Sequence, residues 1–376
     1  MLVVGVPGHD LARMRAEAAV TARGWVLAAS PAEADVLLTV GLPADELAAR
    51  INQVWQQVPR PRHRVGLTDP VELPGALTLA QQALEAGGDP EPLPEASDSD
   101  QAAGHAESHG MESGLHGMAH DSHEMSHGPH DSHESDHGAH GSGGMGHGSM
   151  DMGHGSHGMD HGSMDMSGPG GVPLAGGFEG DRDGLEMDVL HLQLGPVLTD
   201  WPAGLALTLT LSGDVVVKAS ARALPAAAVA APDPLPAAER SAVQRLDRAQ
   251  VLLRLAGWDA VAERTRRLRD ALLGGASLAE LVPAIERIRR RVAGSRLLAW
   301  NLRSASPATA GEYDAETVRR RLVGWLDAAA GGHGQGDEAP LRSEELAAAL
   351  QGRSLAAVRL LVAAGVTTEA GLVLHA

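Results

Sequence analysis

The sequence predicts three parts: an N-terminal α/β domain, a disordered His-rich linker, and a C-terminal α+β domain. Short apolar runs alternate with helical patterns over residues 1–84, which is the order expected for a parallel sheet. Residues 85–180 are poor in Leu, Ile and Val and rich in Gly, Ser, His and Met, a composition that cannot bury a core. A β-hairpin pattern at 181–223 precedes apolar helical stripes over 224–376, which predict a helical bundle.

Three strand patterns stand out in residues 1–84. Leu2–Val6 is a short apolar run that ends at a Pro-Gly pair, which indicates a strand followed by a turn. Val36–Val40 is a continuous run of Val, Leu and Thr, as expected for a strand buried on both faces. His63–Leu67 gives a third strand. We therefore expect a flavodoxin-like parallel sheet with helices on its faces.

Helical patterns lie between these strands. Leu11–Val20 reads as one helix. Ser30 precedes Pro31, and Glu33 follows Ser30 by three positions, so this stretch has the residues of a capping box and predicts the start of a second helix. A third helix ends at Pro59, and its apolar stripe consists of Leu47, Ile51, Val54 and Val58.

Three stretches of this block follow a known family pattern: His9-Asp-Leu-Ala-Arg13, Ala29-Ser-Pro-Ala-Glu-Ala-Asp-Val-Leu-Leu-Thr-Val-Gly41, and Ala48–Val65 with Trp55-Gln-Gln-Val-Pro-Arg-Pro-Arg62. Residues 9–67 thereby resemble the iron–sulfur subunit of respiratory complex I (NADH–quinone oxidoreductase), which shares its fold with the small subunit of nickel–iron hydrogenases. That family holds its cluster with cysteines, some of them just after the strand that corresponds to His63–Leu67. This chain reads Thr68-Asp-Pro-Val-Glu72 there and has no cysteine, so we expect no iron–sulfur cluster.

A second pattern begins at Met187–Leu194, which alternates apolar and polar residues as a strand does. After the loop Gly195–Gly204, the runs Leu205–Leu211 and Val215–Ala219 flank Ser212-Gly-Asp214, which predicts a hairpin. Residues 187–219 resemble the opening of the quinone-site subunit of complex I, the relative of the hydrogenase large subunit. In that family the loop carries histidines. Leu198 and Ala203 stand about where they would fall, so the resemblance does not extend to the quinone chemistry.

The segment from His105 to Met166 carries fourteen of the nineteen histidines and nine of the twelve methionines, and it has no aromatic residue. Its repeats include His-Asp-Ser-His-Glu at 120–124 and 130–134. Imidazole suits Ni, Cu, Zn and Co, and thioether favours Cu(I), so this composition indicates metal binding. A flexible soluble spacer is the alternative. No ordered motif such as HExxH is present. The candidate metal ligands are His105, His109, His116, His120, His123, His127, His130, His133, His137, His140, His147, His154, His157 and His161.

The net charge of −18 is concentrated in one region. Residues 65–181 contain 20 acidic and no basic residues, which leaves 30 basic and 28 acidic residues elsewhere. The acidic region attracts cations and repels nucleic acid, so we expect no nucleic-acid partner. No apolar window is long enough to span a bilayer, and the N-terminus lacks the pattern of a secretory signal. We expect a cytoplasmic protein without direct membrane insertion, peripheral to the membrane only through a complex.

Beyond Pro225 the chain is predicted to be helical. Arginines gather in two rows, 264–269 and 287–291, which we interpret as a solvated face or a docking face for an acidic partner. Trp258, Trp300 and Trp325 are interpreted as core anchors. The helical stripes are Leu246 with Leu253; Val261, Leu268 and Leu272; Leu278, Leu281, Ile285, Ile288 and Val292; Val318, Leu322 and Trp325; and Leu346, Leu350, Leu355, Val358 and Leu361.

No nucleophile elbow, P-loop or dinucleotide-binding fingerprint occurs in the folded blocks. We therefore expect a non-catalytic accessory or degenerate subunit related to NADH–quinone oxidoreductase and nickel–iron hydrogenase, with complex I or hydrogenase-type subunits as partners and divalent metal ions on the linker. The alternative is a metal storage or delivery protein for Ni, Cu or Zn that docks on a metalloenzyme client. A true oxidoreductase is disfavoured by the missing cysteines.

Overall fold

In the computed structural model, the described residues are 1–88, 175–178, 187–228, 233–303, 315–332 and 343–365. Residues 1–92 and 165–376 belong to one compact unit. The predicted linker lies almost wholly outside the described residues. The predicted domain boundaries at 84, 180 and 223 stay predictions.

The N-terminal sheet has three parallel strands in the order β1-β2-β3, namely β1 (Leu2–Gly5), β2 (Val36–Val40) and β3 (His63–Leu67). This confirms the predicted parallel sheet with helices. All five residues of the central strand β2 are buried, because the strand has neighbours on both edges and helices on both faces. The apolar run at 36–40 is therefore the sequence signal of its central position.

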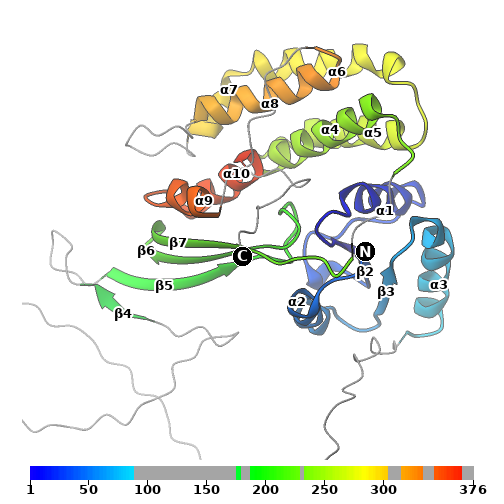
Figure 1. The fold of residues 1–376 in the computed structure, drawn as a ribbon, viewed down its shortest axis with the longest axis horizontal. Coiled ribbons are helices and arrows are strands. Elements are labelled where there is room, and N and C mark those ends of the chain that lie inside the picture. The colour runs from blue at the N-terminus through cyan, green and yellow to red at the C-terminus, as the bar shows by residue number, and fades with distance from the viewer. Residues whose placement is uncertain (89–174, 179–186, 229–232, 304–314, 333–342, 366–376) are drawn as a thin grey trace, which may run out of the picture. The chain divides into compact units, whose positions relative to one another are not determined.

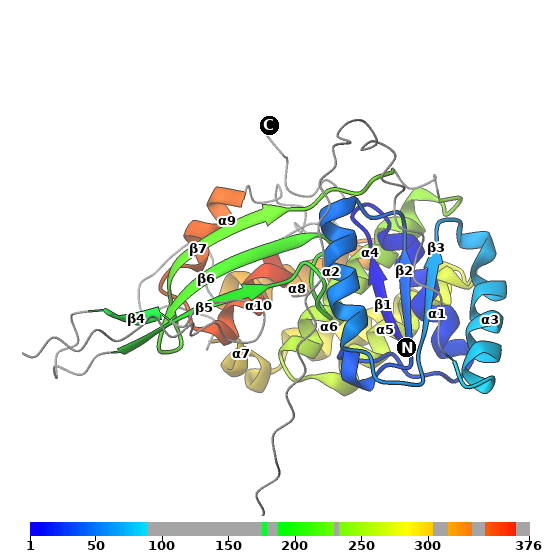
Figure 2. The ribbon, with the colours of Figure 1, turned by 90° about the horizontal axis from the view of Figure 1, so that it is seen from below.

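Helices cover both faces of this sheet (Figures 1 and 2). Leu47 and Ile51 of α2 (Asp45–Gln56) pack with Leu2 and Leu37 in one cluster. The other face forms a second cluster with residues of α1 (Asp10–Ala22) and α3 (Leu73–Glu85). The sequence analysis did not predict α3.

The capping-box pattern at Ser30–Glu33 does begin a helix, with Ser30 at the N-cap and Pro31 at the first helical position, but no α-helix follows. The structure has a single 3-10 turn, η1 (Pro31–Glu33), because β2 begins three residues later. The Glu33 side chain still closes the turn, since its carboxylate accepts hydrogen bonds from the Ala29 backbone N–H (3.1 Å) and the Ser30 hydroxyl (3.2 Å).

The second sheet is antiparallel, in the order β4 (Ala175–Phe178), β5 (Met187–Leu194), β6 (Leu205–Ser212) and β7 (Val215–Ala223). The predicted hairpin is confirmed as β6 and β7. Alternate residues of β6, from Leu205 to Leu211, are buried, so one face of this sheet packs on the helices that follow it.

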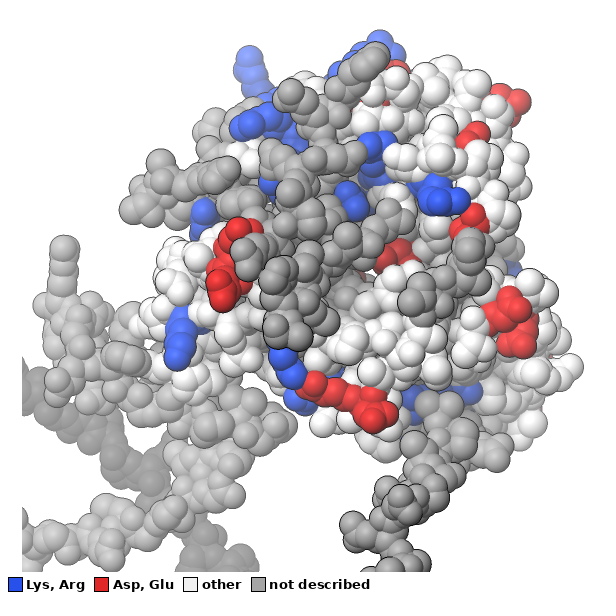
Figure 3. All heavy atoms as spheres, in the orientation of Figure 1, with Lys and Arg blue, Asp and Glu red and all other residues white. Residues whose placement is uncertain are grey.

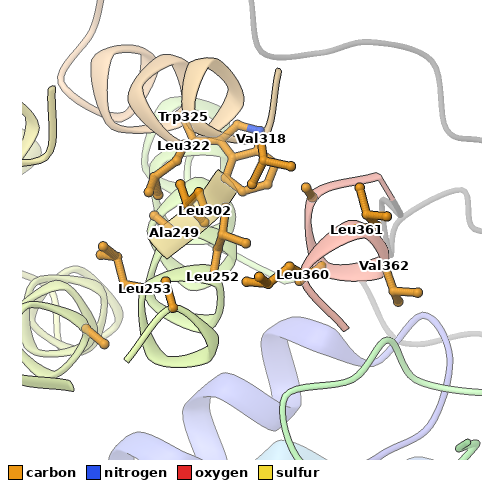
Figure 4. Close-up of a cluster of buried hydrophobic side chains, with 14 of the residues drawn as sticks. Ala249, Leu252, Leu253, Leu302, Val318, Leu322, Trp325, Leu360, Leu361 and Val362 are labelled. Atoms are coloured by element: carbon orange, nitrogen blue, oxygen red, sulfur yellow. The ribbon is translucent and has the colours of Figure 1, made fainter. Parts of the chain in front are cut away.

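Seven helices follow among the described residues. They are α4 (Ala237–Leu255), α5 (Asp259–Leu273), α6 (Leu278–Ala293), α7 (Arg296–Arg303), α8 (Ala315–Ala329), α9 (Ser343–Leu350) and α10 (Leu355–Gly365). Figure 4 shows Leu252 of α4, Leu302 of α7, Trp325 of α8 and Leu360 of α10 in one apolar cluster. Met14 of α1 belongs to the same cluster, so the N-terminal helix shares the core of the C-terminal half. None of the described helices combines the length and apolarity needed to cross a membrane.

Two predictions about the helical region, one on its last helix and one on the burial of Trp300, were wrong. The last stripe was expected to mark one helix, but it is divided between α9 and α10 at Gly352, whose φ is +73°. Backbone hydrogen bonds between this turn and Val216 of β7, from Gly352 N to Val216 O and from Val216 N to Arg353 O (both 2.8 Å), hold the break in place. Of the expected tryptophan anchors, Trp325 is buried, but Trp300 is 65 % exposed because it lies on the outer face of α7.

Candidate functional site

A cavity of about 290 Å³ lies where the N-terminal sheet meets the loop between β5 and β6. Its walls come from β1, the Ala28–Pro31 turn, the Pro196–Ala203 loop and one face of α4, with α1 contributing polar side chains. The two segments that the sequence analysis compared with two different subunits therefore line one cavity.

One wall of the cavity is apolar. Leu2 and Val4 of β1, Val197 of the loop and Val251 of α4 are among its lining residues. Val197 also packs against the cluster that contains Leu2 and Val4, and Leu224 at the end of β7 belongs to that cluster. Hence the second sheet and its loop contribute directly to the core of the first domain.

A buried network of charges from α1, α4 and α5 adjoins the cavity, and Arg13, Glu17 and Asp247 of this network are among the lining residues. The Arg13 guanidinium donates to Asp247 Oδ2 at 2.6 Å and also bonds to Glu17. Arg269 donates to Glu17 Oε2 at 2.8 Å and to Asp247. The side chain of Arg269 is 0 % exposed. Arg269 also donates to Asp270 Oδ1 at 2.7 Å. The two arginines thus compensate for three carboxylates, which offsets the cost of removing these charges from water.

The network sets the protonation of its carboxylates. Burial alone raises the pKa of Asp247, but the guanidiniums of Arg13 and Arg269 outweigh it and lower this pKa to about 2. The same two arginines lower the pKa of Glu17 against the effect of burial and of the neighbouring Asp247. Both carboxylates are therefore ionised near neutral pH. They act as fixed partners of the arginines and not as proton donors.

Asp200 is the carboxylate of the loop that lines this cavity. Its φ is +58°, a left-handed conformation uncommon outside glycine. Its Oδ1 lies 3.0 Å from the Arg254 guanidinium of α4. Burial, together with the nearby Glu17 and Asp247 charges, raises its pKa, although Arg254 and Arg359 oppose the shift. Residues in uncommon backbone conformations and carboxylates with shifted pKa values cluster at functional sites, so Asp200 is a candidate binding residue of this cavity.

Three hydrogen bonds hold the loop that carries Asp200. Thr199 Oγ1 donates to the backbone oxygen of Ala29 at 2.8 Å, which ties the loop to the N-terminal domain. Arg359 of α10 donates to the Thr199 backbone oxygen at 2.7 Å. Trp201 Nε1 donates to the backbone oxygen of Leu205 at 2.7 Å. The loop is thus fixed from the first domain, from α10 and from its own strand.

The positions singled out by the resemblance have clear places in the structure. Leu198 and Ala203, where the family has loop histidines, both line the cavity. Residues 68–72, where the family has cluster cysteines, contain the 3-10 turn η2 (Pro70–Glu72), and Asp69 Oδ1 accepts from Val71 N at 2.9 Å. Neither place offers a thiolate or an imidazole.

The candidate metal ligands His105 to His161 lie outside the described residues, so their sites stay predictions. Of the other histidines, His9 is buried with Nδ1 3.2 Å from the Pro7 oxygen. His191 Nδ1 lies 3.2 Å from Thr210 Oγ1 on the second sheet. Among the residues that the structure describes, no group of three or more His, Asp or Glu side chains is arranged to hold a metal ion.

The charge network was not predicted from the sequence. The interpretation of residues 264–269 as a solvated or docking face was wrong for Arg269, which is fully buried. A signal existed. Val261, Thr265, Arg269 and Leu272 follow helical spacing, and all four are buried. Arg269 therefore occupies the inward stripe of α5, while Arg264 and Arg267 point outward and are exposed.

Comparisons with protein-family models, with curated proteins and with solved structures find no match. The assignment of function therefore depends on the residues and their geometry.

Proposed function

We propose that the chain is a non-catalytic accessory or degenerate subunit related to NADH–quinone oxidoreductase and nickel–iron hydrogenase. In this proposal the N-terminal sheet is a flavodoxin-like domain without an iron–sulfur cluster. Residues 187–219 are a quinone-site hairpin without its histidines, and α4–α10 form a helical bundle behind it. The observation that carries the proposal is that the two resembling segments line one cavity and are joined beside it by the Thr199–Ala29 hydrogen bond (2.8 Å).

The chemistry of the cavity supports a binding or assembly role. Asp247 and Glu17 are held in ion pairs, with the pKa of each lowered, so neither is suited to transfer a proton near neutral pH. The chain supplies no thiol for electron-transfer clusters or for nucleophilic chemistry. The cavity combines apolar lining residues with a few fixed, paired charges, which is the make-up of a binding pocket.

The partners in this proposal are complex I or hydrogenase-type subunits, and any membrane association is made through them. Nucleic acid is not a partner, since the acidic residues 65–181 repel phosphate. The predicted location is cytoplasmic, at the membrane surface only as part of the complex.

Co-purification from detergent-solubilised membranes tests this proposal. The tagged full chain is expected to bring down the subunits of an NADH–quinone oxidoreductase or hydrogenase-type complex, identified by mass spectrometry. A variant without residues 100–168 is the matched control and is expected to bring down the same subunits, because the resembling segments are retained. Recovery of the chain alone from both preparations would contradict the proposal.

The alternative function is metal storage or delivery on a metalloenzyme client, and the density of imidazoles in residues 105–161 favours it. A His-rich chain without a built site gathers each ion at an ordering cost, so several ions should bind, each with affinity in the micromolar range (about 8 kcal/mol). Affinity should rank Cu(II) above Ni and Zn. Protons compete below the imidazole pKa of about 6.5.

Calorimetric titration of the full chain and of the variant lacking residues 100–168 measures this binding. The full chain is expected to bind several ions at about pH 7.5 and far fewer at about pH 5.5, either side of the imidazole pKa. The deletion variant is expected to bind none. Equal binding by both proteins would place the metal elsewhere, and no binding by either would leave the spacer alternative.

A further inference from the structure

Strand β1 is an outer strand of the parallel sheet (Figure 2), and its residues line the cavity. In a parallel strand the N–H and C=O groups of one residue point to the same edge, and successive residues alternate between the two edges. The Val6 N–H donates toward β2 at 2.9 Å, whereas the Met1 oxygen accepts from the Ala28 N–H at 2.8 Å on the opposite side. The backbone groups of Val3 and Gly5 therefore point, like those of Met1, away from β2.

These outward backbone groups are available for binding. Within the described part of the chain, the outward N–H and C=O groups of Val3 and Gly5 have no hydrogen-bond partner. Both residues are partly exposed, while Leu2 and Val4 between them are buried. Two donors and two acceptors thus face the cavity, and backbone groups of this kind are usually paired in folded proteins.

The other outer strand, β3, does not offer the same site. Its outward backbone groups belong to Arg64 and Gly66, because the His63 N–H donates to the Asp35 oxygen at 2.8 Å on the β2 side. Neither Arg64 nor Gly66 is among the lining residues of the cavity. Charged side chains such as Arg64 also protect a sheet edge from further pairing. In contrast, β1 consists of the uncharged residues Leu-Val-Val-Gly.

The surroundings of the β1 edge suit a short extended ligand. Alternate residues of a strand are about 7 Å apart, which is the separation of the free groups at Val3 and Gly5. Leu198 of the loop also lines the cavity and is 38 % exposed, so apolar surface is accessible from solvent beside this edge. Arg13 lies against Gly5, since a Cβ atom added to Gly5 would be 2.9 Å from Arg13 Cδ. The cavity volume of about 290 Å³ is near the lower end for ligand pockets.

Surface charge gives less indication of a partner. On the face of the molecule drawn in Figure 3, the charged side chains of the described residues form small separate groups among uncharged atoms. The carboxylates and guanidiniums nearest the cavity are already paired with one another, as in the bonds of Arg13 with Asp247 and of Arg254 with Asp200. The main-chain and apolar groups of the cavity are therefore the better guide to its ligand.

We propose that the cavity binds a short extended peptide segment of a partner protein, which adds as a strand to the free edge of β1. The N–H groups of Val3 and Gly5 donate to the peptide, their C=O groups accept from it, and an apolar side chain of the peptide packs against Leu198. In this mode of recognition main-chain hydrogen bonds supply affinity and side-chain pockets supply specificity. The inference deepens the proposed binding or assembly role, on which it rests, by giving the chemistry of the partner.

An array of N-acetylated hexapeptides, each alternating Val, Leu or Ile with Thr, Lys or Glu, tests the purified full chain for binding. The strongest binder is then prepared in two N-methylated forms, one methylated at even positions and one at odd positions. A methyl group on the backbone nitrogen removes an N–H donor and leaves the side chains unchanged. One form is expected to bind at least about tenfold more weakly, because it loses its hydrogen bonds to β1. The other form should bind as the parent peptide does.

A proline at the edge supplies the matched comparison in the protein. Val3→Pro removes an outward N–H without breaking a hydrogen bond to β2, and it is expected to weaken peptide binding roughly fivefold. Gly66→Pro makes the same change at an outward position of β3, where an added Cβ atom has no other atom within 4 Å, and should leave binding unchanged. Circular dichroism compares the folding of both variants. Leu198→Ser, at an exposed position, is a second variant that is expected to weaken binding.

Two results would overturn the inference. If no peptide of the array binds, the cavity is not a peptide site, and if both N-methylated forms bind equally weakly, recognition does not follow the edge of a strand. Equal weakening by Val3→Pro and Gly66→Pro would also contradict binding at β1. These measurements use the isolated chain, so they are distinct from the co-purification. Peptide binding without recovery of the redox subunits would support this inference and contradict the proposed function, and the opposite pair of results would overturn this inference alone.

Discussion

Arg269 of α5 and Asp247 of α4 form a buried ion pair, and the side chain of Arg269 has no exposure to solvent. Through Arg13 and Glu17 of α1 this pair extends to the N-terminal domain. Charges so far from water are stable only while each has its partner. The junction between α1 and the helices α4 and α5 therefore depends in part on ion pairs between residues that are more than two hundred positions apart in sequence.

Replacing Arg269 by alanine is expected to destabilise the fold by about 3–5 kcal/mol, because Glu17 and Asp247 would keep only Arg13 as a buried cation. The matched control is Arg264→Ala on the same helix. Arg264 is exposed, so its loss should change the free energy of unfolding by no more than about 0.5 kcal/mol. Urea denaturation measures both, and similar values for the two variants would contradict the network's role.

Acid should weaken the fold through Asp247. Its pKa is lowered in the folded state from 3.8 to about 2, so the folded protein binds the proton more weakly than the unfolded chain does. The stabilisation is complete above about pH 4 and is lost as the pH falls through about 2, with a total of roughly 2 kcal/mol.

Asp200 and Asp270 have raised pKa values, so their titration changes the free energy of unfolding in the opposite direction. Comparing the wild type with Asp247→Asn isolates the contribution of Asp247. Unfolding free energies of the wild type and the variant, measured from about pH 2 to about pH 6, should converge toward the acid end. A constant difference over that range would show that Asp247 does not titrate as described.

Gly204 is required by the contact between the β5–β6 loop and the N-terminal domain. A Cβ atom there would lie 2.5 Å from Pro7 Cγ and 2.6 Å from the Leu224 oxygen. Gly213 has a similar positive φ (+60° against +73°) but open space around it. Gly204→Ala should therefore cost about 1–3 kcal/mol more than Gly213→Ala, because only the first adds a steric clash to the backbone strain. Thermal unfolding compares the stabilities of the two variants. Equal losses of stability would mean that the loop shifts to accommodate the added Cβ atom.

Substitutions of Trp325 and Trp300 give another matched comparison. Trp325 is 2 % exposed in the core that joins α4, α7, α8 and α10, whereas Trp300 is 65 % exposed on α7. Trp325→Ala is expected to cost about 3–5 kcal/mol and leave a cavity. Trp300→Ala should have an effect below about 0.5 kcal/mol on stability. The reverse order in denaturation experiments would restore the prediction that Trp300 is a core anchor.

The local elements of the fold were predictable because their signals are local. The strand bounds at 36–40, 63–67 and 187–194 agree with the structure. Residues 36–40 form a continuous apolar run and residues 187–194 alternate apolar and polar residues, and both patterns are local. The division between α9 and α10 was not predictable from the sequence, because it depends on backbone hydrogen bonds of Gly352 and Arg353 with Val216. These residues are more than one hundred positions apart in the chain.

The charge network could not be predicted for the same reason. Arg13 and Glu17 are four residues apart and suggest only a surface pair on one helix. Their burial follows from the docking of α1 against α4 and α5, which no local pattern reveals. Arg269 within an apolar stripe was the one visible sign, and the surrounding exposed arginines concealed it.

We propose above that this chain is related to two redox subunits and has no redox centre. Anaerobic purification followed by absorption and electron paramagnetic resonance spectroscopy, iron analysis and an NADH–quinone assay measures this most directly. We predict no iron–sulfur signal, no stoichiometric iron and no NADH–quinone activity from the isolated chain. A cluster spectrum with matching iron, or quinone reduction by the chain alone, would contradict the account.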